Sequence, residues 1–381
     1  MLLFLLFFST SVIAGVALPQ QFLVYFGTYT GTNSKGIYVS RFDAAAGELS
    51  APTLAAESIS PSFLAVAPDH RFLFAVNETR SFAGKPGGSV TAFKLDARTG
   101  KLAFLNQQPS EGADPCHIVA DDTGKYVLVA NYSSGSVTVL PVQTNGFIGV
   151  PVSVTQHHGS SVNQQRQAGP HAHCVVLDAA SHRVFVCDLG LDKVMIYHLD
   201  EATGRLVADE NPSVELKAGS GPRHMVFHPD GNHEYVIKEL SSTLKAIEYD
   251  SQSGGLKEIQ TVSTLPENFR GASTCAEIAV HPSGKFIYAS NRGDDSITVF
   301  AIVAQTGRLD FVERQSTLGK TPRSFAIDPT GQYLITANQN SDNIVVFRIN
   351  AQTGRLTSTG QNFQIGKPVC VVFVPTGPAT P

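Results

Sequence analysis

The sequence has no tryptophan, only 3 methionines and few charged residues, which make up 16% of its 381 positions. Its net charge of −4 leaves no basic surface of the kind that binds nucleic acid, so we expect no nucleic-acid partner. Its 5 cysteines include no CxxC pair, which excludes the common zinc and dithiol motifs. No stretch shows a sustained helical period of apolar residues between caps, and we therefore expect almost no helix.

Turn residues are abundant, with 33 glycines and 21 prolines, and they punctuate a pattern that occurs seven times. Each copy has a run of β-branched and aromatic residues, a turn such as PDG, PSG or PTG, and a second apolar run. The copies follow at intervals of about 50 residues, which is typical of repeat architectures built from small sheets. They begin at Pro61, Pro115, Ala172, Pro222, Cys275 and Pro322, with a half-copy at Pro368.

The repeat predicts an all-β fold, a seven-bladed β-propeller that forms one domain over residues 20–381. Two further runs in each copy, joined by turns such as Thr306-Gly307, give the four strands of a propeller blade. The half-copy at Pro368 supplies only an inner strand, and FLVYFGTYT (22–30) with the residues after it supplies the missing strands. We therefore expect the first blade to be closed by N- and C-terminal strands, which leaves no free sheet edge.

The first residues, MLLFLLFFSTSVIAGVA, form a short apolar run that ends in small residues. Such a run is typical of a secretory signal peptide and is short for a membrane-spanning helix. We therefore expect residues 1–17 to be a signal peptide and the mature protein to be exported, periplasmic or secreted, without a membrane attachment. An uncleaved anchor is the alternative, since the terminal amine is the only charge before the apolar run.

Cys174 and Cys187 stand at equal distances from the expected turn at Ala180-Ser181, so we expect them to face each other across a hairpin. Cysteines without a spacing motif are most often buried thiols that pack as small apolar side chains, and we favour this interpretation. A disulfide between the two is the alternative in an exported protein, although cross-strand disulfides are strained.

The start of the first strand and the end of the second lie at the same end of a hairpin, and first strands line the channel of a propeller. Ionisable residues at these positions should therefore gather at one mouth of the channel, where they make a candidate site. An Asn or Asp recurs there, which indicates strand-end hydrogen bonding, whereas residues that break the repeat favour function. The recurring residues are Asn77, Asn131, Asp188, Asn291 and Asn338, and those that break the repeat are His173, Arg223, His224, Glu239, Glu277 and Arg292.

Histidines gather at one place in the sequence, where His171 and His173 are two residues apart and His157 and His158 precede them. Alternate residues of a strand share a face, so two of these rings could meet at a metal ion. No further ligand follows at the spacing of a zinc motif, and the PDG and PTG turns lack the acidic residues of a calcium loop. We therefore predict no metal ion and no cofactor.

Several runs, among them RQAGPHAHCVVLD, GPRHMVFHPDG, AEIAVHPSGKFIYASNRGDDSITVF and PRSFAIDPTGQYLITANQNSDN, strongly resemble the seven-bladed propeller lactonase family. That family contains the propeller-type 6-phosphogluconolactonases and the fungal carboxymuconate lactonising enzymes, and the resemblance covers the chain from Tyr25 onward. It implies a site made by a histidine of PHAH, the arginine of GPRH, a glutamate after the second strand of the fifth blade and the arginine of SNR. The matching residues are His173 (or His171), Arg223, Glu239 and Arg292.

The resemblance implies hydrolysis of a sugar-acid lactone, which needs an activated water, a stabiliser for the oxyanion and an acid for the leaving alkoxide. We expect Glu239 or His173 to be the base, and His224 is the candidate proton donor. Arg223 and Arg292 would hold the oxyanion or an anionic group. A carboxymuconate-type lactonising isomerase and a non-catalytic exported binding propeller are the alternatives. The residues expected to bind substrate are His171, His224, Glu277, Arg323 and Asp188.

The charges at this mouth predict the kind of substrate. Arg223, Arg292 and Arg323 would attract a small anionic lactone, unless neighbouring carboxylates hold them in a network of ion pairs. Lys238 stands where the family has an asparagine, and it either pairs with Glu239 and lowers the pKa of that carboxylate or points away from it. The sequence makes no prediction of oligomeric state.

Overall fold

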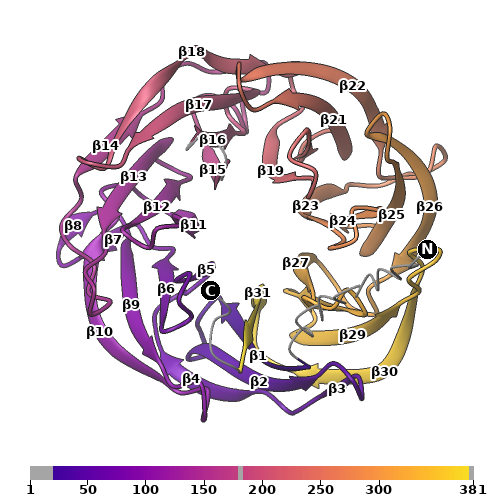
Figure 1. Cartoon of the computed structure of the whole chain (residues 1–381), viewed down its shortest axis with the longest axis horizontal. Coiled ribbons are helices and arrows are strands. Elements are labelled where there is room, and N and C mark those ends of the chain that lie inside the picture. The colour runs from indigo at the N-terminus through magenta and orange to yellow at the C-terminus, as the bar shows by residue number, and fades with distance from the viewer. Residues whose placement is uncertain (1–19, 179–182, 377–381) are drawn as a thin grey trace, which may run out of the picture.

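The computed structural model describes residues 20–178 and 183–376, and it arranges them as seven blades around a central axis (Figure 1). The predicted all-β, seven-bladed propeller is thereby confirmed. The described residues include no helix, hence none long and apolar enough to cross a membrane. The predicted signal peptide, residues 1–17, and the turn at Ala180-Ser181 lie outside the described residues.

Blades two to four are antiparallel sheets whose strands follow chain order from the axis outward (Figure 1). Their inner strands are runs of Val, Leu, Phe and Ala that are buried along nearly their whole length. A small extra hairpin, β7 (Ser81–Phe82) with β8 (Lys85–Pro86), projects from blade two. The strands are β5 (Leu64–Val66), β6 (Phe72–Asn77), β9 (Ser89–Leu95) and β10 (Leu102–Pro109) in blade two; β11 (Pro115–Ala120), β12 (Tyr126–Asn131), β13 (Ser136–Pro141) and β14 (Ser153–Gln156) in blade three; and β15 (Ala172–Leu177), β16 (Arg183–Asp188), β17 (Lys193–Asp200) and β18 (Arg205–Glu215) in blade four.

Blades five to seven repeat this arrangement, and each has an outer strand of 9 residues. Tight turns join the two inner strands of each blade, as the PDG, PSG and PTG sequences predicted. The strands are β19 (Pro222–Phe227), β20 (His233–Lys238), β21 (Thr243–Asp250) and β22 (Gly255–Ser263) in blade five; β23 (Thr274–Val280), β24 (Phe286–Arg292), β25 (Ser296–Val303) and β26 (Arg308–Ser316) in blade six; and β27 (Pro322–Ile327), β28 (Tyr333–Asn338), β29 (Asn343–Ile349) and β30 (Leu356–Gln364) in blade seven.

Blade one is assembled from both ends of the described chain, as predicted. Its innermost strand is the C-terminal β31, which pairs antiparallel with the N-terminal β1 (Figure 1). The next strand outward pairs with two short segments instead of one continuous outer strand. The ring is therefore closed by hydrogen bonds between strands whose paired residues are 340 or more positions apart in the sequence. The strands are β31 (Pro368–Pro375), β1 (Gln21–Thr28), β2 (Gly36–Asp43), β3 (Glu48–Leu49) and β4 (Thr53–Glu57).

The core is divided into seven apolar clusters, each between two neighbouring blades. Between blades five and six, for example, the buried Tyr235 and Ile237 belong to one cluster with Ile287. Cys174 and Cys187 face each other in register across β15 and β16, and both are buried free thiols. The favoured interpretation of these cysteines as small apolar side chains is confirmed.

The recurring asparagines make hydrogen bonds at the ends of the second strands, as predicted. Asn131 Nδ2 donates to the Ser110 carbonyl, to Ser136 Oγ and to Thr138 Oγ1 at 3.1, 3.2 and 3.1 Å. Asn291 makes the corresponding bonds in blade six. The amide N–H groups of these two asparagines bind their own blade and the connection from the preceding blade, although Asn131 Oδ1 has no partner among the described residues. These bonds support the structural interpretation of the column.

Candidate active site

A β-bulge near the start of the inner strand sets the positions of the candidate side chains. The pairing register shifts around His173 in β15, around Arg223 in β19 and around Arg323 in β27, so each of these residues is the extra one in its strand. A bulged residue leaves the regular alternation of faces, and bulges often re-aim a side chain next to a site. The bulge therefore directs the side chains of successive residues in one strand to different depths along the channel.

Glu239, directly after β20, is the centre of the candidate site. Its Oε1 lies 2.7 Å from Arg166 Nη2, and its Oε2 lies 2.7 Å from Arg292 Nη2 and 3.1 Å from Arg223 Nε. Burial by itself would raise the pKa of this carboxyl, but Arg292, Arg223 and Arg166 outweigh burial and lower the pKa to about 2. Glu239 is therefore a fixed negative charge that binds three guanidinium groups.

The pocket above Glu239 has a volume of about 220 Å³. Three of its lining residues are cations and two are carboxylates, and Arg223 lies behind Glu239, so the site carries a net positive charge. Larger hollows, such as one of about 440 Å³ lined by Val119, Leu177 and Phe227, are mainly apolar. The lining residues, which we call the arginine pocket, are Tyr29, Glu78, Cys116, Tyr132, Arg166, His173, Glu239, Arg292 and Arg323.

The opposite wall of the arginine pocket is built by Tyr29 and Glu78. The Tyr29 hydroxyl lies 2.9 and 2.8 Å from the two carboxylate oxygens of Glu78. The Arg323 guanidinium lies over the Tyr29 ring, 5.4 Å from its centroid. Among residues 20–178 and 183–376, Arg323 has no carboxylate within ion-pair distance, so its charge faces the pocket without a close counter-ion.

His173 is a neutral imidazole in this pocket. It is 4% exposed, and burial together with Arg223, His224 and Arg323 holds its pKa well below the usual value. Its Nδ1 lies 3.8 Å from Cys116 Sγ, and the Tyr132 ring packs edge-on against it with centroids 5.4 Å apart. The neutral ring has an unprotonated nitrogen that can take a proton, whereas the Glu239 carboxylate is held by three arginines. The same burial and cations make His173 a weaker base than an ordinary histidine.

His224 and Glu277 form a second cluster on the far side of Arg223. Arg223 Nη1 lies 3.1 Å from His224 Nε2, and His224 Nδ1 lies 2.8 Å from Glu277 Oε1. Burial and Arg223 hold the pKa of His224 well below its usual value. The neutral ring therefore accepts from Arg223 at Nε2 and donates to Glu277 from Nδ1. Glu277 lines a separate hollow of about 310 Å³ with Phe63 and Ser324, outside the arginine pocket.

Asp188 and His171 support the loop beside the pocket. One oxygen of Asp188 accepts hydrogen bonds from the backbone N–H groups of His171, Gly190 and Leu191 at 2.7 to 3.1 Å. The other lies 2.6 Å from His157 Nδ1. The His171 ring stacks on Tyr132 with centroids 4.4 Å apart and donates from Nδ1 to the Tyr132 carbonyl at 2.9 Å.

Lys238 points away from Glu239, which settles the alternatives raised by the sequence. Its pKa is lowered by burial and by Lys245, while Glu258 opposes the shift, and Glu239 is not among the charges that act on it. Lys238 is 3% exposed and makes no ion pair with Glu239 among the described residues, where Glu239 pairs with three arginines instead.

Sequence reasoning brought together His173, Arg223, Glu239 and Arg292, and the structure places all four at one end of the axis. It missed Arg166, which comes from the insertion between blades three and four, and Tyr29 and Tyr132. The insertion itself was visible as a break in the repeat, but nothing in its sequence gave the direction of Arg166. The described residues of the arginine pocket include no trio of metal ligands.

The chain matches the family described as lactonase, 7-bladed beta-propeller, over residues 23–373. It is 39% identical over 305 residues to a Bacillus subtilis protein named 6-phosphogluconolactonase, covering 80% of this chain and 84% of that protein. A Formosa agariphila protein with the same name is 34% identical, with 79% and 85% covered. The solved structure of the Pseudomonas aeruginosa periplasmic gluconolactonase has a TM-score of 0.88 at 36% identity, and the match covers 94% of this chain and 100% of that one.

Proposed function

This chain belongs to the seven-bladed β-propeller lactonase family, and from that we propose that it hydrolyses the ring ester of a sugar-acid lactone in the arginine pocket. The names of its relatives, 6-phosphogluconolactonase and gluconolactonase, support this reaction. One observation carries the assignment to this pocket: Glu239 forms ion pairs with three arginines, and the neutral His173 lies in the same pocket. Ester hydrolysis needs both an oxyanion stabiliser and a base.

In the proposed reaction, His173 takes a proton from a water molecule while the water oxygen attacks the lactone carbonyl carbon. The carbonyl oxygen becomes an oxyanion next to Arg292, whose buried Nε has no hydrogen-bond partner among the described residues. Collapse of this intermediate breaks the bond between the carbonyl carbon and the ring oxygen. The imidazolium of His173 then returns its proton to the leaving alkoxide, which gives the open sugar acid.

Glu239 takes no proton in this scheme, because its pKa of about 2 makes it a weak base. It instead fixes Arg166, Arg223 and Arg292 before the substrate binds. His224 and Glu277 position Arg223 from the other side and are not proton donors, since His224 Nε2 is occupied by Arg223 and its Nδ1 by Glu277. Preorganised cations of this kind stabilise a developing negative charge at little reorganisation cost.

We further propose that the preferred lactone is anionic. Arg323 lies in the pocket without a close carboxylate among the described residues, and the net positive charge of the site would attract a phosphate or carboxylate. His171 and Asp188, which were expected to bind substrate, act in this proposal by holding Tyr132 and the loop of residues 188–191.

Export is the remaining part of the proposal. The Pseudomonas aeruginosa neighbour is named a periplasmic gluconolactonase, and the apolar run of residues 1–17 fits a signal peptide. Sequencing the N-terminus of the protein purified from its native host should find it shortly after residue 17. A native protein that starts at Met1 would contradict export with cleavage.

The reaction is tested with the purified protein on gluconolactone, on its 6-phosphate and on a carboxymuconate. We expect hydrolysis of the lactones and a loss of about 10²- to 10⁴-fold in kcat for His173→Gln, the range for a general base. His158→Gln, which changes an exposed histidine, is the control and should keep full activity. Lactonisation of the muconate would favour the lactonising isomerase. If none of the substrates is turned over, the result would favour a propeller that binds a ligand without catalysis.

A further inference from the structure

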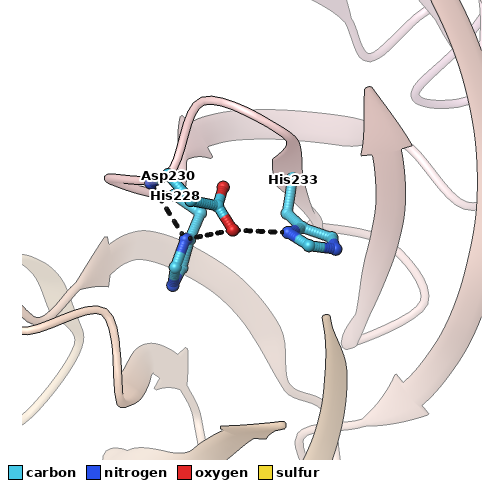
Figure 2. Close-up of side chains that lie close together, drawn as sticks. All are labelled: His228, Asp230 and His233. Atoms are coloured by element: carbon cyan, nitrogen blue, oxygen red, sulfur yellow. Dashed lines mark hydrogen bonds and ion pairs between the residues drawn. The ribbon is translucent and has the colours of Figure 1, made fainter. Parts of the chain in front are cut away.

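The turn between β19 and β20 holds a cluster of ligand-type side chains that the lactonase reaction does not use. His228, Asp230 and His233 lie together there (Figure 2). The same two strands carry Arg223 and Glu239 at their other ends, about 20 Å away for six-residue strands. The cluster is therefore separate from the arginine pocket.

The three side chains converge on one point. Asp230 Oδ2 lies 3.0 Å from His228 Nδ1 and 2.8 Å from His233 Nδ1, and all three ligand atoms lie within 4.8 Å of one another. Their side chains are 11%, 31% and 13% exposed, so an ion and a water molecule can reach them. Zinc bonds of about 2.0–2.1 Å place tetrahedral ligand atoms about 3.3 Å apart, so the two distances from Asp230 to the histidines need to lengthen by only a few tenths of an ångström.

The contacts of His228 show which ring nitrogen carries the proton and which one accepts. Its Nε2 lies 2.8 Å from the Gly284 carbonyl, to which it donates, and its Nδ1 accepts from the backbone N–H of Asp230 at 3.1 Å. In this tautomer the single lone pair of Nδ1 accepts the Asp230 backbone N–H, and the Asp230 carboxylate oxygen lies beside it at 3.0 Å. A metal ion bound at Nδ1 would therefore replace this backbone hydrogen bond. A histidine that binds a metal commonly donates its other ring N–H to a carbonyl in this way.

The other blades show that the fold does not require this trio. The corresponding three positions are His281, Ser283 and Phe286 in blade six, where His281 Nε2 donates to the Gly331 carbonyl as His228 does to Gly284. In blades three and seven they are Asp121, Thr123 and Tyr126, and Asp328, Thr330 and Tyr333.

The ring at the third position packs against the outer turn of the next blade. In blade six this ring is Phe286, against Gly354, and in blade five it is His233, against Gly307. A Cβ on Gly307, whose φ is 64°, would lie 2.3 Å from His233 Cδ2, so the ring and the glycine fit closely. A phenyl ring meets this packing demand, so the packing does not require the ring nitrogens of His233. Asp230 Oδ1 accepts from the backbone N–H of Asn232 at 2.8 Å within the turn, and Asp230 Oδ2 is the oxygen that lies between the two histidines.

We propose that His228, Asp230 and His233 form a binding site for one divalent transition-metal ion of the zinc type, with water in the fourth position. Two imidazoles and one carboxylate are a common ligand set for such ions. The bound ion would join the β19–β20 turn to the neighbouring turn through His228 and Gly284. Because it binds the folded protein only, it would raise the thermal unfolding midpoint.

The test uses the full chain, freed of metal with a chelator and titrated with Zn²⁺ in a calorimeter. We expect saturable binding of one ion per chain and a rise in the unfolding midpoint. Asp230→Ser and His233→Phe introduce the residues that blade six has at these positions, and each should weaken binding by at least about 10- to 100-fold. Both variants should keep lactonase activity and a cooperative unfolding transition.

The control is His198→Phe, which removes an exposed histidine that pairs with Asp209 at 2.7 Å and offers only two ligands. It should leave zinc binding unchanged. Absence of saturable binding to the wild-type chain would overturn the proposal. So would equal affinity in the wild-type chain and both β19–β20 variants, or loss of binding in His198→Phe.

Discussion

Glu239 and Glu277 are both mostly buried in neighbouring blades around the same axis, yet their pKa values are shifted in opposite directions. Glu239 has three arginines at 2.7 to 3.1 Å, and they lower its pKa to about 2 although burial would raise it. Glu277 has one neutral histidine at 2.8 Å, and burial raises its pKa because Arg223 compensates only in part. The neighbouring charges rather than the depth of burial therefore decide the direction of each pKa shift.

The same difference separates the roles of the two regions. The arginine pocket around Glu239 is open enough for a ligand and holds cations that are fixed before any substrate arrives. The His224–Glu277 pair has its polar atoms engaged with each other and with Arg223. The arginine pocket therefore has the features of a substrate site, and the His224–Glu277 pair positions Arg223 beside it.

The largest expected effect is on stability, from removing the charge of Glu239. Glu239→Gln leaves the buried Arg223, the mostly buried Arg292 and the partly exposed Arg166 without their shared partner. This should lower the free energy of unfolding by about 3–5 kcal/mol. Glu277→Gln keeps an acceptor for His224 and should cost only about 1 kcal/mol, as for one altered hydrogen bond. Urea unfolding of both variants measures the difference. An equal loss of unfolding free energy in the two variants would show that the two carboxylates contribute equally to stability, which would contradict this prediction.

The pH dependence of stability should separate the two carboxyls with opposite signs. Glu239 has a lowered pKa, so its contribution is complete above the ordinary value of 4.5 and is lost as the pH falls toward 2. Glu277 has a raised pKa, so its contribution is present at low pH and is lost as the pH rises above 4.5. Unfolding of the wild type, Glu239→Gln and Glu277→Gln between pH 3 and pH 7 measures both slopes. An acid-side slope that persists in Glu239→Gln would contradict the assignment.

A smaller effect is expected from anions. Sulfate should compete with lactone in the arginine pocket and raise KM by a few-fold, and the inhibition should weaken in Arg323→Gln because a cation facing the pocket is lost. Glu277→Gln should leave the inhibition unchanged, since Glu277 lies outside this pocket. A neutral and a phosphorylated lactone with equal KM, together with no sulfate effect, would contradict an anionic substrate.

Much of this arrangement could be predicted from the sequence, because the repeat fixes which strand ends meet. The closing of blade one, the facing of Cys174 and Cys187 and the gathering of Glu239 with Arg292 all follow from aligning the copies. The direction of each side chain could not be predicted from the alternation of strand faces, because a bulge around Arg223 interrupts this alternation before His224.

Residues outside the repeat could not be placed from the sequence. Arg166 lies in an insertion with no counterpart in other blades, so no alignment gave its position. Tyr29 directly follows β1, the second strand of blade one, so its place at the strand end could be predicted, but its contact with Glu78 of another blade could not. The sequence also gave no sign that His173 is neutral, because its pKa depends on burial and on cations from other blades.

The central claim is that the arginine pocket opens the lactone ring, and kcat/KM for a gluconolactone in Arg292 variants tests it most directly. Arg292→Ala should lower kcat/KM by on the order of 10²- to 10³-fold, as for loss of one oxyanion contact, and Arg292→Lys should recover part of the loss. A thermal unfolding scan of each variant identifies any loss due to misfolding. A folded Arg292→Ala protein that hydrolyses the lactone at the wild-type rate would contradict the claim.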